Sequence, residues 1–162
     1  MRFLLKLIGS LSVGLVLACL AVAAEPTPNS DSLDLSKYRG QVVLLDFWAS
    51  WCEPCRQSFP WLNEMRAKYA DRGLVVIGIN VDGDRADAAR FLSEVPANFP
   101  IVYDPNGKLA TKYDLPGMPS SFVVGPNGVV VARHIGFRDN LRAAREAELQ
   151  KLLSGPGVVP LR

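Results

Sequence analysis

Two cysteines separated by two residues are the side chains in this sequence best suited to chemistry. Cys52 and Cys55 enclose Glu53 and Pro54, follow an apolar run and open a segment with helical periodicity. A C-x-x-C pair between a strand and a helix is typical of a redox centre. Unpaired backbone N–H groups and the dipole at the start of a helix favour a thiolate there. Pro54 restricts the conformations open to the short loop.

The two thiols are expected to have different roles. Cys52, the outer thiol, is the predicted nucleophile, and Cys55, one turn into the helix, is the predicted buried thiol that resolves a mixed disulfide. A permanent structural disulfide is one alternative, but so short a loop stabilises a fold little. A metal site is another, but it needs two further ligands. His134 is the only histidine, and it is predicted to be a surface residue of a strand.

Two carboxylates accompany the cysteines. Asp46 is the only charged residue in the apolar run Val42–Phe47. Burial would raise its pKa and let it exchange a proton with Cys55; the alternative is a carboxylate in water at a frayed strand end. Glu53 places a negative charge beside Cys52, which disfavours its thiolate and favours a reductant over a strong oxidant. Glu53 could instead interact with the helix dipole, and Arg56 opposes its charge in part.

The elements that position these residues follow from hydrophobic periodicity and turn signals. Strands are predicted at 42–47, 74–79, 101–103, 121–124 and 129–135, and helices at 52–69, 84–94, 108–113 and from the cap Asp139 to residue 153. The order βαβα predicts parallel strands in the first half. The turn at 125–128 predicts an antiparallel hairpin in the second half. The expected fold class is therefore α/β, with a central mixed sheet flanked by helices.

Several of these segments together resemble the thioredoxin fold. The segment Leu44–Cys55 is similar to that fold's active-site segment, and Pro60 matches its kink proline. The segment 117–120 is similar to its cis-proline loop. The insertion between the strands at 74 and 121, and the hairpin turn, resemble the exported TlpA/ResA/DsbE subgroup. The resemblance covers about residues 34–153.

This resemblance implies roles for further residues. Pro119 would be cis and lie against the two sulfurs, and the backbone of Met118 would pair with an extended segment of the partner. Trp51 and Pro54 would contact the substrate, although Trp51 could instead only shield the helix start. Asp46 matches thioredoxin itself, whereas many ResA- and DsbE-like sequences carry an amide at that position.

The beginning of the chain has the pattern of an export signal. Arg2 and Lys6 precede an uncharged apolar stretch at 7–24, and small residues at its end favour cleavage. A retained membrane anchor and lipidation of Cys19 are the alternatives, and all three place the domain in the periplasm or at the extracytoplasmic face. A linker is predicted at 25–36, the thioredoxin-like domain at 37–154 and a tail at 155–162.

Composition narrows the function classes further. The chain has 162 residues, of which 49% are hydrophobic and 21% charged, which excludes a disordered chain. Its 18 basic residues exceed its 16 acidic ones, but Arg2 and Lys6 belong to the export signal. The remaining domain is neutral, so nothing in its charge indicates a nucleic acid partner.

The predicted function is that of an exported thiol–disulfide oxidoreductase, working as a reductase. Its redox group would be the Cys52–Cys55 disulfide, with no organic or metal cofactor implied. Its partners would be protein disulfides, such as the heme-site cysteines of apocytochrome c or those of a copper-site protein, and a membrane electron donor. A dithiol oxidase, a copper-handling carrier and a redox-silent interaction domain are the alternatives. A peroxidase is disfavoured because its usual single cysteine with Pro/Thr neighbours is absent.

Overall fold

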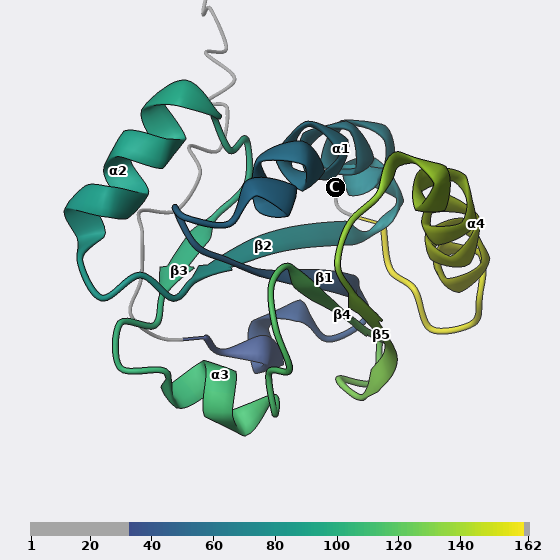
Figure 1. Ribbon diagram of the computed structural model, residues 1–162. Helices are drawn as coiled ribbons and strands as arrows, with labels where there is room; N and C mark the ends of the chain where they lie inside the picture. Colours follow the sequence, from purple (N-terminus) through teal and green to yellow (C-terminus); the bar gives the residue numbers. More distant parts are fainter. Residues whose placement is uncertain (1–32, 161–162) are drawn as a thin grey trace, which may run out of the picture.

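The computed structural model describes residues 33–160, which form a mixed five-stranded sheet with helices on both faces (Figure 1). The strand order is β3-β2-β1-β4-β5. These strands are β1 (Val42–Trp48), β2 (Leu74–Asn80), β3 (Ile101–Tyr103), β4 (Ser120–Val124) and β5 (Val130–Ile135). β1, β2 and β3 are parallel, whereas β4 runs antiparallel to both β1 and β5. The predicted mixed sheet and hairpin are confirmed.

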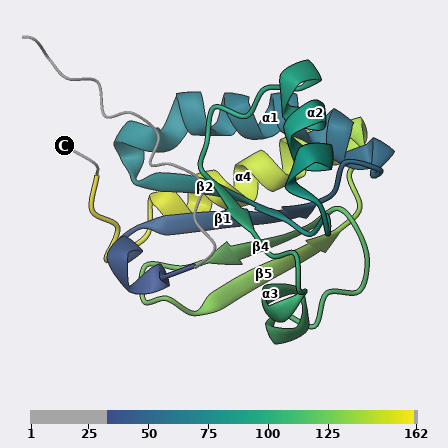
Figure 2. The ribbon, with the colours of Figure 1, turned by 90° about the vertical axis from the view of Figure 1, so that its left-hand side faces the viewer.

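The helices divide between the two faces of this sheet. They are α1 (Glu53–Tyr69), α2 (Arg85–Glu94), α3 (Lys108–Lys112) and α4 (Arg142–Leu153), with 3-10 turns η1 (Leu35–Tyr38), η2 (Ala70–Arg72) and η3 (Asp139–Leu141). The helices α1, α2 and α4 lie on one face, and α3 and η1 lie on the other (Figures 1 and 2). None of the helices within residues 33–160 is both long and apolar enough to cross a membrane.

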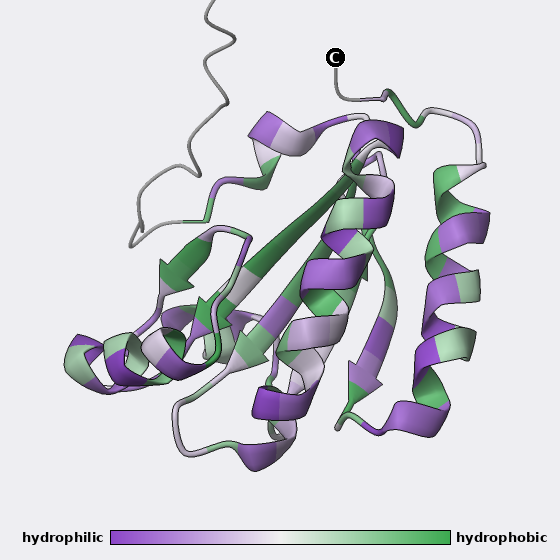
Figure 3. Cartoon of the chain, turned by 90° about the horizontal axis from the view of Figure 1, so that it is seen from above, coloured by the Kyte–Doolittle hydropathy of each residue, from purple (hydrophilic) through white to green (hydrophobic). Residues whose placement is uncertain are grey.

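Helices on both faces explain why every residue of β1 is buried. Side chains alternate along a strand, so even-numbered residues face one side and odd-numbered ones the other. Leu44 and Trp48 pack with residues of α1, α2 and α4, such as Phe59, Phe91 and Leu149. We call this group the upper cluster. Leu45 and Phe47 pack on the other face with residues of α3 and η1, such as Leu109 and Leu35. We call this group the lower cluster. Asp46, an even-numbered residue of β1, therefore faces α1. The strands around it are mostly hydrophobic (Figure 3).

The folded domain begins before residue 37, although the sequence predicts a linker over 25–36. Leu33 and Leu35 pack against the lower cluster. Asp34 caps η1 by accepting a hydrogen bond from the Ser36 N–H at 3.0 Å. Residues 33–36 thus belong to the domain because their leucines cover an apolar sheet face. The predicted export signal and the rest of the predicted linker lie outside the described residues.

The end of the chain differs from the sequence expectation in its details. The predicted helix cap at Asp139 is wrong, because Asp139 begins the turn η3 and α4 starts only at Arg142. The Asp139 carboxylate instead lies 3.7 Å from the Arg142 guanidinium. Within the predicted tail, Val158 packs against the upper cluster, and the Val159 N–H donates to the Gly40 carbonyl at 2.6 Å.

Candidate active site

Cys52 and Cys55 form a disulfide at the start of α1. Cys52 is the N-cap residue, because its carbonyl accepts the Cys55 N–H at 3.1 Å. The same N–H lies 3.3 Å from the Cys52 sulfur. Such a donor stabilises negative charge on that sulfur when the pair is reduced. Cys52 is 4% exposed and Cys55 0%, so Cys52, the predicted nucleophile, is the more accessible of the two cysteines.

A buried carboxylate holds the turn that carries Cys52. Asp82 accepts the Ser50 N–H at 2.9 Å and the Ser50 hydroxyl at 3.0 Å. The side-chain amide of Asn80 donates to the same carboxylate at 2.8 Å. The turn itself closes with a bond of 3.1 Å from the Cys52 N–H to the Ala49 carbonyl. Each bond limits the positions open to the nucleophile.

Sequence reasoning missed Asp82, but a signal for it exists. Asp82 follows the parallel strand β2, as Cys52 follows β1. The carboxyl ends of neighbouring parallel strands meet at one edge of a sheet, which is where α/β proteins place their sites. An acid directly after the second buried strand is therefore expected near the cysteine pair.

Asp46 is buried on the face of β1 that α1 covers, so a carboxylate in water at a strand end is excluded. Its Oδ1 accepts the Ser121 hydroxyl at 2.6 Å, whereas Oδ2 has no hydrogen-bond partner among the described residues. Burial raises the pKa of Asp46 to about 7. The hydrogen bond from Ser121 and the positive charge of Arg145 lower this pKa and offset part of the effect. A carboxyl with such a pKa can both accept and return a proton near neutral pH.

The proline loop lies immediately before β4. The Met118–Pro119 peptide bond is cis, as the resemblance implies. The Pro119 carbonyl accepts the Gly136 N–H at 2.8 Å, and the Ser120 hydroxyl donates to the Gly117 carbonyl at 2.7 Å. Met118 is partly buried and packs against the cluster that contains both cysteines. The proline loop thus packs, through Met118, against the same core cluster as the two cysteines.

The surface around the disulfide combines an aromatic ring with opposite charges. Trp51 is 72% exposed, and Pro54 and Glu53 are also exposed. Arg56 lies 3.9 Å from the Glu53 carboxylate but only 2.9 Å from that of Glu94. An exposed ring beside a reactive pair can pack against a docked chain.

His134 does not join the cysteines. It lies on the edge strand β5, where its Nε2 is 2.7 Å from a Glu148 oxygen, and its side chain is half-buried. Within residues 33–160, no group of three or more His, Cys, Asp or Glu side chains could hold a metal ion. The ligands that the metal alternative needs are therefore not assembled in this part of the chain.

Comparison with known proteins identifies a family and relatives with similar sequences. A sequence model of the AhpC/TSA family matches residues 21–133. The thiol-disulfide oxidoreductase ResA of Bacillus subtilis is 31% identical over 103 residues, which are 64% of this chain and 58% of that protein. ResA of Oceanobacillus iheyensis is 30% identical over 102 residues, which are 63% and 53% of the two chains. The match spans little more than half the length of these relatives.

Solved structures extend the similarity to the fold. A candidate thiol:disulfide interchange protein DsbE from Chlorobium tepidum superposes with a TM-score of 0.75 and 45% identity, over 78% of this chain and 91% of that one. The exposed lipoprotein thioredoxin of Streptococcus pneumoniae gives a TM-score of 0.65 and 31% identity, over 73% and 90%. The chain belongs to the AhpC/TSA family, has a thioredoxin-like fold, and is similar to the ResA and DsbE thiol–disulfide oxidoreductases.

Proposed function

We propose that this protein is a thiol–disulfide oxidoreductase that reduces disulfides of partner proteins. The observation that carries the proposal is the disulfide Cys52–Cys55 at the start of α1, with the buried carboxyl of Asp46 on the sheet face that this helix covers. The names of the ResA and DsbE relatives support the same chemistry. The pair stores two electrons by itself, so the proposal includes no organic or metal cofactor.

The reaction starts from the reduced pair. The Cys52 thiolate attacks one sulfur of the partner disulfide, which forms a mixed disulfide and releases the other partner sulfur as a thiolate that takes a proton from water. Cys55 then gives its proton to the Asp46 carboxylate and attacks the Cys52 sulfur. The second partner thiolate leaves and is protonated by Asp46 or water. The partner gains two electrons and two protons, and the cysteine pair ends as the disulfide that the structure shows.

The residues around the pair supply binding and position in this scheme. The backbone of Met118 pairs with an extended strand of the partner, and Trp51 and Pro54 pack against it. Asp82 holds the turn that carries Cys52 through its two bonds to Ser50.

Trapping of partners tests this function. Cys55→Ser removes the resolving thiol, so Cys52 should remain joined to its partner and be isolated as a mixed disulfide. The matched control Cys52→Ser removes the nucleophile and should trap nothing. Equal capture by both variants would contradict the assignment of Cys52 as nucleophile, and absence of any mixed disulfide would contradict the function.

Whether the pair reduces or oxidises its partners is tested by its reduction potential. A reductase requires a potential well below about −120 mV, the value of the strong oxidant DsbA. A potential near that value, with a disulfide that destabilises the fold, would instead support a dithiol oxidase. In an oxidising compartment the reductase must be reduced again, and we propose a membrane electron-transfer protein as the donor.

The proposed partners are exported proteins whose cysteines must be kept reduced. The heme-site cysteines of apocytochrome c are the first candidate, and the cysteines of a copper-site protein are the second. Mass spectrometry of the complexes trapped by Cys55→Ser distinguishes them. Capture of other redox proteins alone would indicate a relay.

We propose export of the domain with cleavage after Ala24. The apolar stretch at 7–24 supports this location, as does the pneumococcal relative, which is described as an exposed lipoprotein. The mass of the mature protein separates the three routes: a chain that begins at Glu25, one lipidated at Cys19, or one that keeps residues 7–24 as an anchor. A full-length chain in the cytoplasmic fraction would contradict all of them.

A further inference from the structure

Arg145 is a buried cation on α4 to which the reaction above gives no role. It is 7% exposed, and with Leu149 and Leu153 it forms the buried stripe of this helix. Positions four residues apart on a helix share one face, so this is a site where an apolar residue is expected. Arginine is almost never fully buried without partners. A local rule broken in this way is often the mark of a functional position.

The guanidinium is anchored at the turn behind the proline loop. Its Nη2 donates to the Gly136 carbonyl at 2.7 Å, and the Gly136 N–H donates to the Pro119 carbonyl at 2.8 Å. The guanidinium carbon lies 5.6 Å from the centre of the Phe137 ring, which packs against Trp61. These contacts hold the charge in one place beneath α4.

The same charge acts on Asp46. Arg145 lines a small pocket together with Ser121, the residue whose hydroxyl binds the Asp46 carboxyl. Its positive charge lowers the pKa of Asp46 against the effect of burial. In return, Asp46 and Glu148 raise the pKa of Arg145 against its own desolvation. Each buried charge thus favours the charged form of the other.

Among residues 33–160, the strand partners of Asp46 supply no competing cation. Gly78, its partner in β2, has no side chain, and Ser121, its partner in β4, is neutral. The face of α1 toward the sheet carries Cys55. His134 of β5 lies opposite Ser121, but its ring is engaged with Glu148 of α4.

We propose that Arg145 is a positioning residue for disulfide exchange, a buried cation on α4 that favours the carboxylate form of Asp46. This inference rests on the proposed function, since the carboxylate is the form that takes the proton of Cys55. Arg145 thereby extends to lower pH the range in which the mixed disulfide is resolved.

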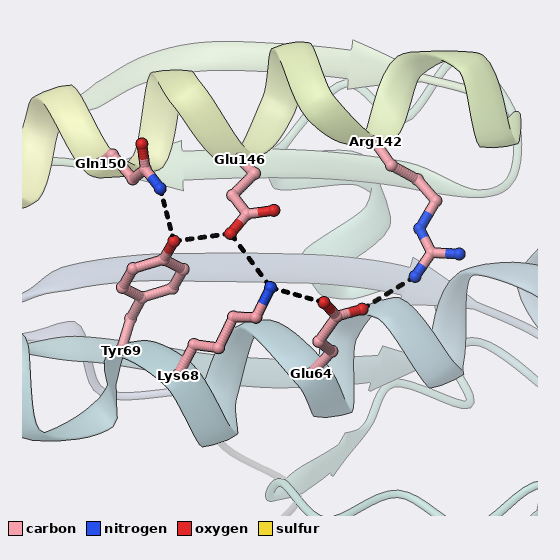
Figure 4. A network of polar contacts seen from close by, with 6 residues as sticks. All are labelled: Glu64, Lys68, Tyr69, Arg142, Glu146 and Gln150. Atoms are coloured by element: carbon pink, nitrogen blue, oxygen red, sulfur yellow. Dashed lines mark hydrogen bonds and ion pairs between the residues drawn. The ribbon is translucent and has the colours of Figure 1, made fainter.

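Two substitutions separate the charge of Arg145 from its hydrogen bond. Arg145→Gln removes the charge but keeps a side-chain donor for the Gly136 carbonyl, whereas Arg145→Lys keeps the charge without the planar guanidinium. Arg142→Gln is the matched control on the same helix. Arg142 belongs to an outer network between α1 and α4 that does not include Asp46 (Figure 4), and the members of this network are Glu64, Lys68, Tyr69, Arg142, Glu146 and Gln150.

The direct readout is the titration of the Asp46 carboxyl by carbon NMR in the oxidised protein. We expect Arg145→Gln to raise its midpoint by about one pH unit, the low end of the effect of a neighbouring opposite charge, whereas Arg145→Lys and Arg142→Gln leave it near the wild-type value. An unchanged midpoint in Arg145→Gln, or an equal rise in Arg142→Gln, would overturn the inference. If Arg145→Gln does not fold, Arg145→Met, which also removes the charge, takes its place: a raised midpoint supports the charge role, and an unchanged midpoint refutes it.

The kinetic readout is reduction of the chromogenic disulfide DTNB by the reduced protein in a stopped-flow instrument. The first thiol release reports attack by Cys52, and the second reports resolution by Cys55. At pH 6, Arg145→Gln should slow the second release about tenfold, because one pH unit is a factor of ten in carboxylate. The first release should be unchanged. A wild-type protein that shows no second release would refute the proposed function, while the NMR titration would still decide the role of Arg145.

Discussion

Replacement of Asp46 by asparagine should change how the stability of the fold depends on pH. The pKa of Asp46 is about 7 in the folded protein and 3.8 in an exposed carboxyl. Between these values the folded state holds a proton that the unfolded state has lost, so the free energy of unfolding falls as pH rises. About three pH units at about 1.4 kcal/mol each give a loss of about 4 kcal/mol between pH 4 and pH 7. This is a large part of the 5–15 kcal/mol typical of a domain.

Asp46→Asn keeps an oxygen that can accept the Ser121 hydroxyl but cannot ionise. The variant and the wild type should therefore have a constant difference in stability below about pH 4. As the pH rises from about 4 to about 7, the free energy of unfolding of the variant should increase relative to that of the wild type. Above about pH 7 this difference should be constant. Urea unfolding of the oxidised proteins at several pH values measures this, because disulfide-bonded cysteines do not titrate. Parallel pH profiles for the two proteins would refute the buried, protonated carboxyl and with it the proton exchange with Cys55.

Three further results are expected. Asp46→Asn should slow resolution of the mixed disulfide by about 10²-fold or more, the range of a lost general base, and leave the attack by Cys52 unchanged in single-turnover kinetics. Asp82→Ala leaves the part-buried donors of Ser50 and the buried amide of Asn80 without this partner, so thermal unfolding should show a loss of about 1–3 kcal/mol and disulfide reduction should slow. Its control Asp84→Ala removes an exposed helix cap, which costs about 1 kcal/mol without an effect on the reaction. Trp51→Ala should raise KM for protein disulfides but not alter stability, since the ring is 72% exposed.

Local patterns were sufficient to predict the elements and the reactive pair. The apolar run of β1, the N-cap at Asp84 and the turn at 125–128 each depend on neighbours in sequence, and all three are present in the structure. The buried position of Asp46 followed in the same way, because a single acid within a fully apolar strand has no exposed face to occupy.

Local patterns alone do not identify the residues that support the site, since this requires knowing which elements are neighbours in the fold. Arg145 lies among alanines and charged residues that are typical of a solvated helix, and its burial comes with tertiary contacts to the Gly136 carbonyl and the Phe137 ring. Asp82 contacts Ser50 because β1 and β2 are adjacent in the sheet. The cap predicted at Asp139 failed because a 3-10 turn precedes α4, and side-chain preference alone does not distinguish the two kinds of turn.

The two carboxylates near the cysteines have unequal weight in the exchange reaction. The Glu53 side chain is 74% exposed, and the Arg56 guanidinium offsets part of its charge. Charges in such a setting interact weakly through water and are screened by salt. Asp46 lies in the core, where water does not weaken its interaction with Ser121 and Arg145. The preference for a reductant that Glu53 suggests is therefore a small effect. The pH dependence of disulfide exchange should therefore follow the titration of Asp46 and the charge of Arg145.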